Sequence, residues 1–260
     1  MINQLQADLY VQRHSTAMTV SVLVACAAAA LYTFLQYRLA SGGLDPASAS
    51  GVQGVSDILI ISLLGPLLIG LAIARPFETK SVHAALLAAG RGPVVASKAM
   101  TASLAVILVS LPYGLAALVG RATGASFEPA LPTTFALLTA DSVELDAGGV
   151  VHLVAVSVVT GLLYAAKLAV CIPLAFVLKR PIVVMATGFV WSFVADLLVS
   201  TVSDTAPGEA IAGLTPFSAD RMPLPDSSTG DLLTTTAVSV VFIAAMGALA
   251  WLLFRRADVK

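Results

Sequence analysis

Charged side chains are scarce in this sequence. Of its 260 residues only 11% are Asp, Glu, Lys or Arg, whereas 58% are hydrophobic. Soluble domains carry about 25% charged residues, and a globule with so few would expose large apolar patches to water. The composition therefore excludes a soluble enzyme and a disordered scaffold, and it predicts a membrane protein.

Net charge, cysteine and histidine are low as well. The chain has 14 basic and 15 acidic residues, so no overall basic character points to nucleic acid. Cys26 and Cys171 lie inside apolar runs and are expected to be buried thiols rather than a disulfide or a metal site. The three histidines are isolated, and neither an H-E-x-x-H motif nor a Gly-x-Ser-x-Gly elbow is present. We therefore predict no catalytic, metal or cofactor site in this chain, and an enzyme is the weakest of the function classes.

Long apolar runs, by contrast, are abundant. A membrane-spanning helix needs about 20 mostly apolar residues, and six runs reach or approach that length: 16–37, 56–74, 98–119, 150–178, 181–203 and 232–254. The connections are too short for a separate soluble domain. We therefore predict an all-α integral membrane protein in which residues 1–260 form one domain of six transmembrane helices, without a nucleotide-binding domain. Gly161 and Pro173 predict a tilt or a kink in the long fourth run.

The basic residues predict the orientation of these spans, because cytoplasmic loops collect lysine and arginine. With the N-terminus inside, one side holds ten basic residues: Arg13, Arg75, Lys80, Arg91, Lys98, Lys179, Arg180, Arg255, Arg256 and Lys260. The other side holds three, Arg38, Arg121 and Arg221. Both termini and the loop over 75–97 are therefore predicted to be cytoplasmic. A cleaved signal peptide ending near residues 27–30 is the alternative at the N-terminus, but the apolar run continues to Tyr37 and favours a retained span.

Three other segments carry weaker patterns. Ile2, Leu5 and Leu9 lie at helical spacing, which fits either an amphipathic helix on the inner leaflet or a frayed tail. Residues 38–55 are rich in Gly, Ser and Ala, and we expect a flexible linker. Short apolar islands at 135–138 and 211–214 predict short helices in the outer leaflet before the last span.

The loop between the second and third spans contains a helix of its own. Thr79 and Ser81 are candidate caps for its start, and Gly90 is its expected stop. One face carries apolar residues at helical spacing, namely Val82, Ala85, Leu86 and Ala89. Such a stripe must be covered by lipid, by the helix bundle or by a partner protein.

This loop resembles the corresponding region of type-2 (ABC-2-like) ATP-binding-cassette exporter permeases. The matching elements, in chain order, are Glu78, Ser81-Val82, Leu86-Leu87, Gly90, Arg91 and Lys98. The six-span count, with both ends inside, and the Phe254-Arg255-Arg256 ending extend the resemblance more weakly over the chain. The sequence departs from the family at Lys80-Ser81, where a Gly-Thr pair is usual, and this leaves the start of the loop helix open.

The resemblance implies a permease subunit that pairs with a second permease subunit and binds a separate ATPase, which would hold ATP and Mg²⁺. The loop helix would be the cytoplasmic coupling helix, docking into the ATPase through Glu78, Val82, Leu86, Leu87 and Arg91. The implied cargo is a hydrophobic or amphipathic compound, such as a drug, an antimicrobial peptide or a lipid, exported across a plasma membrane that we expect to be bacterial. The alternative is a surface loop whose charges only set the topology.

Lys167 and Asp196 are charged residues inside predicted spans. A lone charge in a helix centre costs about 2.5–3.5 kcal/mol on insertion scales, so we expect the two side chains to pair across the hairpin that joins spans four and five. A substrate or proton path through them is the other interpretation. Two rival functions therefore stay open: an ion- or proton-coupled secondary transporter using this pair, and a non-transporting membrane assembly factor.

Overall fold

The structure is a computed structural model that describes residues 2–128, 134, 146–203, 205, 208–209 and 212–256. The described part of the chain contains helices, turns and irregular connections only. The predicted apolar island at 135–138 lies outside it. Of the second island, the structure describes residues 212–214, and this stretch ends in a turn. A single 3-10 turn follows at Ala219–Arg221.

Six helical segments in the described part are long and apolar enough to cross a membrane, in agreement with the six predicted runs. These are α2 (Thr16–Ala40), Pro46–Glu78 with α4 (Asp57–Ile73) at its centre, α7 (Arg91–Ala122), α8 (Ala147–Leu168), α10 (Pro181–Ser203) and α12 (Thr229–Arg255). Shorter helices are α1 (Ile2–Arg13), α3 (Ala49–Val52), α5 (Arg75–Glu78), α6 (Val82–Ala89) and α9 (Cys171–Leu178).

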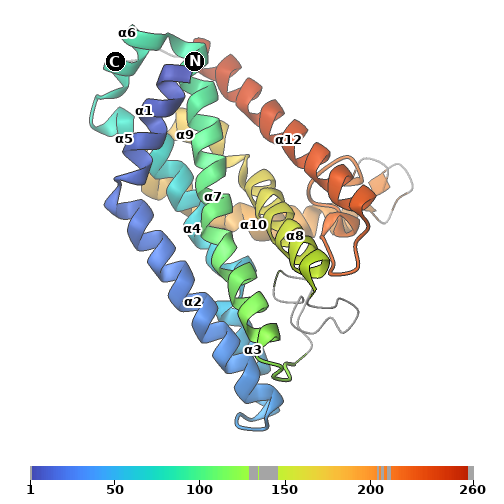
Figure 1. The fold of residues 1–260 in the computed structure, drawn as a ribbon. Helices are drawn as coiled ribbons and strands as arrows, with labels where there is room; N and C mark the ends of the chain where they lie inside the picture. Colours follow the sequence, from blue (N-terminus) through green and yellow to red (C-terminus); the bar gives the residue numbers. More distant parts are fainter. Residues whose placement is uncertain are drawn as a thin grey trace.

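Both ends of the chain lie at the same end of the helix bundle (Figure 1). The loop helix α6 lies there too, whereas the turn that leads from α2 to α3 lies at the opposite end. We call the first the termini end. An even number of spans returns a chain to its starting side, so this arrangement agrees with an even number of crossings. Its assignment to the cytoplasm stays a prediction.

The fourth predicted run is broken, as its proline suggested. α8 ends at Leu168 and α9 begins at Cys171, with two residues between them. Pro173 has no N–H to donate to the carbonyl of Ala169, so the α-helical ladder cannot continue through this point. Gly161 produces no break. Instead, a Cβ there would collide with the Ser110 hydroxyl of α7, so the glycine permits the two helices to pack closely.

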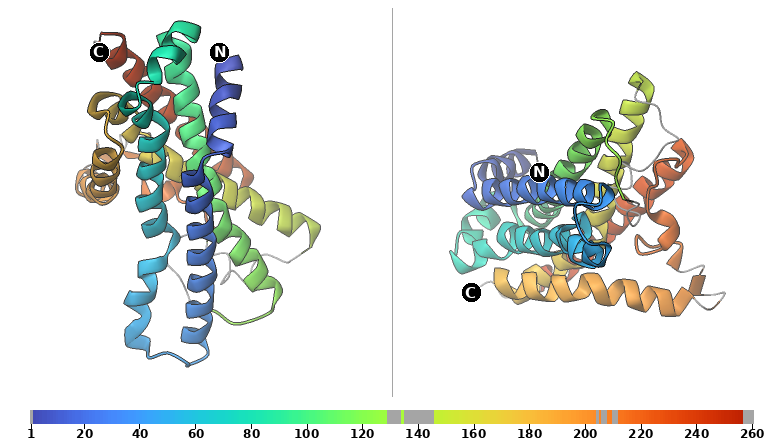
Figure 2. Two further views of the ribbon diagram at one scale, coloured as in Figure 1. Left: turned by 90° about the vertical axis from the view of Figure 1, so that its left-hand side faces the viewer. Right: turned by 90° about the horizontal axis from the view of Figure 1, so that it is seen from below.

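α10 crosses the bundle instead of running along it. Figure 2 (left) shows α2 and α4 from the side and α10 nearly end-on. Glycines permit this crossing: a Cβ on Gly70 would lie 2.9 Å from the Pro181 carbonyl oxygen, and one on Gly188 would lie 2.5 Å from the Cys171 sulfur. Close backbone approach at small residues is how helices associate in membranes.

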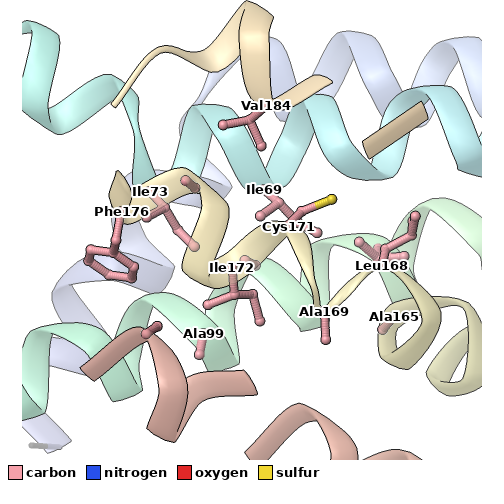
Figure 3. Close-up of a cluster of buried hydrophobic side chains, with 14 of the residues drawn as sticks. Ile69, Ile73, Ala99, Ala165, Leu168, Ala169, Cys171, Ile172, Phe176 and Val184 are labelled. Carbon is pink, nitrogen blue, oxygen red and sulfur yellow. The ribbon is translucent and has the colours of Figure 1, made fainter. Parts of the chain in front are cut away.

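The largest hydrophobic cluster joins α4, α7, α8, α9 and α12. Figure 3 shows α9 at its centre, with Ile69 and Ile73 of α4 on one side of it and Ala99 of α7 on the other. Ile172 of α9 is fully buried there. The short helix after the break is thus an inner part of the bundle.

Two expectations about the connections need correction. The segment predicted as a flexible linker forms consecutive helical turns, η1 (Pro46–Ser48), α3 and η2 (Gln53–Val55), and the Asp45 carboxylate caps the first of them by accepting from the Ala47 N–H at 2.8 Å. The N-terminal segment is a helix, but Asp8 faces the bundle and is 8% exposed, whereas Ile2 is 69% exposed. Its polar side packs on α7, while Leu5 and Leu9 of the apolar stripe are half-buried.

Candidate functional site

The loop helix α6 lies at the termini end and begins at Val82, directly after Ser81, the second of the two candidate cap positions. α5 ends at Glu78, and Lys80 follows with φ of 58°, a left-handed conformation that glycine adopts without steric cost. The Thr79 hydroxyl donates to the Arg75 carbonyl and contacts the Ser81 hydroxyl at 3.0 Å, so neither side chain caps α6. Gly90 ends the helix with φ of 76°, as predicted, and α7 starts at the next residue.

The residues predicted to dock into an ATPase separate into two groups. Val82 is 4% exposed and is covered by this chain, and Leu86 is half-buried and packs against the main hydrophobic cluster. Leu87 is 90% exposed. Glu78 is exposed and shares a cavity of about 190 Å³ with Lys179 and Arg180. Val82 is therefore not a surface anchor, while docking itself stays a prediction that now rests on Leu87.

Arg91, the fifth predicted docking residue, is held within the chain. Its Nη1 donates to the carbonyl oxygens of Phe254 at 3.1 Å and Arg255 at 2.5 Å. These carbonyls belong to the last turn of α12, where helix carbonyls lack intrahelical donors, and a positive charge is favourable at that end of the helix dipole. Arg91 therefore fastens the α6–α7 junction to the end of α12.

Three phenylalanines attach the loop to α9 and, a second time, to α12. The ring of Phe77 in α5 lies 6.0 Å from that of Phe176 in α9 and 5.7 Å from that of Phe254 in α12, in edge-to-face arrangements. Phe176 and Phe254 are 5.1 Å apart. Such aromatic pairs add about 0.5–1.5 kcal/mol each beyond simple burial. The loop is consequently part of a packed assembly of α5, α9 and α12.

An ion pair attaches α1 to the start of α7. Lys98 Nζ lies 2.7 Å from Asp8 Oδ1, and the Ser97 hydroxyl donates to Asp8 Oδ2 at 2.5 Å. The Gln12 amide nitrogen donates to the Thr101 carbonyl at 3.1 Å. The sequence analysis missed this contact, although the spacing of Gln4, Asp8 and Gln12 along one helix face is a signal for it.

The predicted contact between Lys167 and Asp196 is present. Lys167 Nζ lies 3.0 Å from Asp196 Oδ1, and the Phe217 ring centre lies 6.0 Å from the same ammonium. The two side chains are 20% and 52% exposed. The carboxylate on α10 therefore faces outward over half its surface, and the role of the pair stays open.

A second polar centre, around Asp57, was not predicted as a site. Asp57 is fully buried at the start of α4. Its Oδ2 accepts from the Thr134 hydroxyl at 2.6 Å and from the Tyr164 hydroxyl at 3.0 Å, and its Oδ1 accepts from the Ile58 N–H at 3.0 Å. These donors satisfy the carboxylate without a cation among the described residues. Because Thr134 and Tyr164 come from distant parts of the chain, no local pattern signals this centre.

The described residues contain no cluster of His, Cys, Asp or Glu that would hold a metal ion. Cys171 is buried as expected, but Cys26 is exposed. Cys26 lies on a face of α2 that the rest of the chain leaves open, on an apolar groove of about 880 Å³ between α2 and α7. An apolar run did not distinguish a face covered by protein from one covered by lipid.

Comparison with known proteins does not identify a family. The sequence matches no protein-family model, and no curated protein matches it either. The resemblance to ABC-2-like permeases therefore stays a prediction.

Proposed function

We propose that this chain is the permease subunit of an ATP-binding-cassette exporter. The observation that carries the proposal is α6, which presents Leu87 outward at the end shared by both termini and is fastened to the bundle on both sides. An unattached surface loop that only sets topology has no need for these attachments. The partners are a separate ATPase that binds ATP and Mg²⁺ and a second permease subunit, with the termini end in the cytoplasm.

The attachments give a physical route for the energy of ATP hydrolysis. A movement of α6 is transmitted to α7 through the single residue Gly90 and to α12 through Arg91. At the other end of α6, the movement is transmitted to α9 and α12 through Phe77. Coupling between distant sites requires packed elements that move together, and this loop contacts three of the helices that build the main cluster.

The apolar groove between α2 and α7 supports a hydrophobic or amphipathic cargo. It is lined almost entirely by apolar side chains, with Phe34, Tyr37 and Phe127 among them. Ligand sites for apolar compounds have this character. The proposed direction, from the cytoplasm or the inner leaflet outward, follows from the resemblance.

A co-purification experiment tests the proposal. Leu87→Asp should abolish binding of the proposed ATPase partner and its stimulated ATP hydrolysis, because a few desolvated side chains dominate a small interface. Leu86→Asp is less informative, since Leu86 also packs inside. Leu214→Asp is the matched control, because Leu214 is 76% exposed in the loop before α12. Retained ATP-dependent export by Leu87→Asp would contradict the proposal.

The half-exposed Asp196 favours one second candidate, an ion- or proton-coupled transporter using Lys167 and Asp196. Charged residues that face a pathway inside a membrane are commonly functional. Purified protein in liposomes separates the two functions. Transport driven by an ion gradient without any ATPase supports the second candidate, and its absence together with ATPase binding supports the first.

A further inference from the structure

Asp57 is a buried acidic residue that the proposed function does not use. It begins α4, is fully buried, and belongs to a segment long and apolar enough to cross a membrane. The two ion pairs in the described part of the chain use other carboxylates, Asp8 and Asp196. No lysine, arginine or histidine of this part forms an ion pair with Asp57. An isolated charge inside a membrane is costly, and a buried carboxyl without a cation commonly takes up a proton instead.

The groups that contact Asp57 can accommodate a proton on it. Its Oδ2 lies 2.6 Å from the Thr134 hydroxyl and 3.0 Å from the Tyr164 hydroxyl. A hydroxyl can donate or accept, and its hydrogen rotates to suit its partner. An ionised Asp57 accepts from both hydroxyls, whereas a protonated Asp57 donates to one of them. The backbone N–H groups of Ile58 and Thr134 donate to either form. The cluster therefore loses no hydrogen bond when Asp57 gains or loses a proton.

Two more tyrosines lie around Asp57. Tyr32 of α2 and Tyr113 of α7 are fully buried, with ring centres 6.3 Å apart, and both are near enough to interact with a charge on Asp57. Their hydroxyls donate to the Gln53 Oε1 at 3.1 Å and to the Val55 carbonyl at 2.8 Å. Together with the tyrosine of α8, they are the titratable groups that face Asp57 from the described helices packed against it. All three are neutral hydroxyls, so none of them compensates a negative charge.

The break between α8 and α9 lies close to this cluster along the chain. Tyr164 is four residues before Leu168, where α8 ends, and α9 begins at Cys171. Hinges in proteins are commonly a few residues at the ends of helices, so this break gives α8 a place to pivot. A tilt of α8 would withdraw the Tyr164 hydroxyl from Asp57 and admit water to the carboxyl.

We propose that Asp57 is a proton-binding site, which holds a proton in the packed bundle and releases it when α8 moves away from α4. In the release step the O–H bond of the Asp57 carboxyl breaks and the proton passes to water. The carboxylate that remains keeps the N–H of Ile58, which belongs to the same helix. Opening of the bundle is thereby linked to the proton concentration. This inference depends on neither an ATPase partner nor a particular cargo.

Infrared spectroscopy of the full chain in nanodiscs near neutral pH tests the proposal through the C=O stretch of a protonated carboxyl. The parent protein should show this band, and Asp57→Asn should lose it. Asp45→Asn is the matched control, because Asp45 is exposed and caps η1 outside the cluster. It should keep the band. A parent protein without the band, or an unchanged band in Asp57→Asn, would overturn the inference.

A second pair of variants gives the same answer if Asp57→Asn does not fold. Tyr164→Phe keeps the ring and removes one hydroxyl partner of Asp57, so it should shift the frequency of the band. Tyr10→Phe, at a position that is 65% exposed, should leave it unchanged. The same frequency in the parent and in Tyr164→Phe would show that the band does not come from Asp57.

Proton release also has a thermodynamic signature. Unfolding exposes Asp57 to water, where an aspartate is ionised above about pH 5. From about pH 5 to about pH 7, the unfolding equilibrium constant of the parent should therefore rise by up to about tenfold per pH unit more than that of Asp57→Asn. Asp45→Asn should behave like the parent. An equal pH dependence in the parent and in Asp57→Asn would show that the folded protein holds no proton on Asp57.

Discussion

The pair formed by Lys167 and Asp196 can be tested with a double-mutant cycle. The structure places Lys167 Nζ 3.0 Å from Asp196 Oδ1. Lys167→Met and Asp196→Asn each remove one charge and leave the other without its partner. The double variant removes both. A charge exchange, with Lys167→Asp and Asp196→Lys together, restores opposite charges in reversed positions.

The expected magnitudes follow from burial. An unpaired charge at a helix centre costs about 2.5–3.5 kcal/mol. Lys167 lies in the last turn of α8 and Asp196 is half-exposed, so each single variant should lose less stability than that. Asp196→Asn should destabilise the protein more, because it leaves the charge of Lys167, which is only 20% exposed, without a partner. Lys167→Met leaves the charge of Asp196 without a partner, but that side chain is 52% exposed. The double variant should recover much of the loss, giving a coupling free energy of about 0.5–3 kcal/mol.

The assay is the thermal unfolding of the purified variants in nanodiscs, together with the folded yield in the membrane. Sites that do not interact add within about 0.5 kcal/mol. A coupling inside that limit would refute the reasoning that the pair stabilises the hairpin. Well-folded single variants that no longer transport would instead assign the pair to the transport path.

Other predictions address the termini end. Phe254→Ala should destabilise the protein by about 3–5 kcal/mol in the same unfolding assay, because its fully buried ring joins α5, α9 and α12, whereas Leu252→Ala, at a 43% exposed position of the same helix, should cost far less. Lys80→Gly should stabilise by on the order of 1 kcal/mol, since it relieves a left-handed backbone, while Thr79→Gly, at φ of −84°, should destabilise. Leu87→Cys in a cysteine-free background should resist a membrane-impermeant label added outside, and Asp226→Cys should react. The reverse labelling pattern would place the termini end outside and remove the ATPase argument.

Apolar runs and single special residues were sufficient to predict the spans. Helix length in a membrane is fixed by the bilayer, so each of the six runs contains a helix of about that length, although the fourth run is divided into α8 and α9. Pro173 acts on its own helix through a missing N–H, and Gly90 acts through its φ. Lys167 and Asp196 were predicted to pair on the assumption of a simple hairpin; the pair forms, although α9 lies between α8 and α10 in the chain. All these inferences are local or depend on one hairpin.

Contacts between distant segments could not be predicted. Asp57 meets Thr134 and Tyr164, 77 and 107 residues away in the sequence. Arg91 looked like a free end of the loop helix, but it caps a helix that ends more than 160 residues later. In the loop, periodicity found the apolar face of α6 correctly. It did not show that this face turns inward, because a helix can bury such a stripe against its own bundle or against a partner.

Hydropathy also could not order the helices from the inside to the outside of the bundle. The six spans are similarly apolar, yet 61% of the most apolar stretch of the Pro46–Glu78 segment is buried, compared with 17% for α10 and α12. Lipid tails are as apolar as a leucine side chain, so a face against lipid and a face against protein have the same composition. Cys26 illustrates this, because its apolar neighbours suggested burial and its side chain is exposed.

The exposed helices bear on the proposed pairing of subunits. α10 buries little of its surface in this chain and carries Asp196, whose half-exposed carboxylate would be costly against lipid. Water or polar groups must therefore reach that side of α10. A second permease subunit that meets α10 would supply such a surface, because a boundary between two subunits can hold both protein polar groups and water. This requirement arises from Asp196 alone. A neighbouring subunit would therefore lower the free energy of the bundle most at the face of α10 around Asp196.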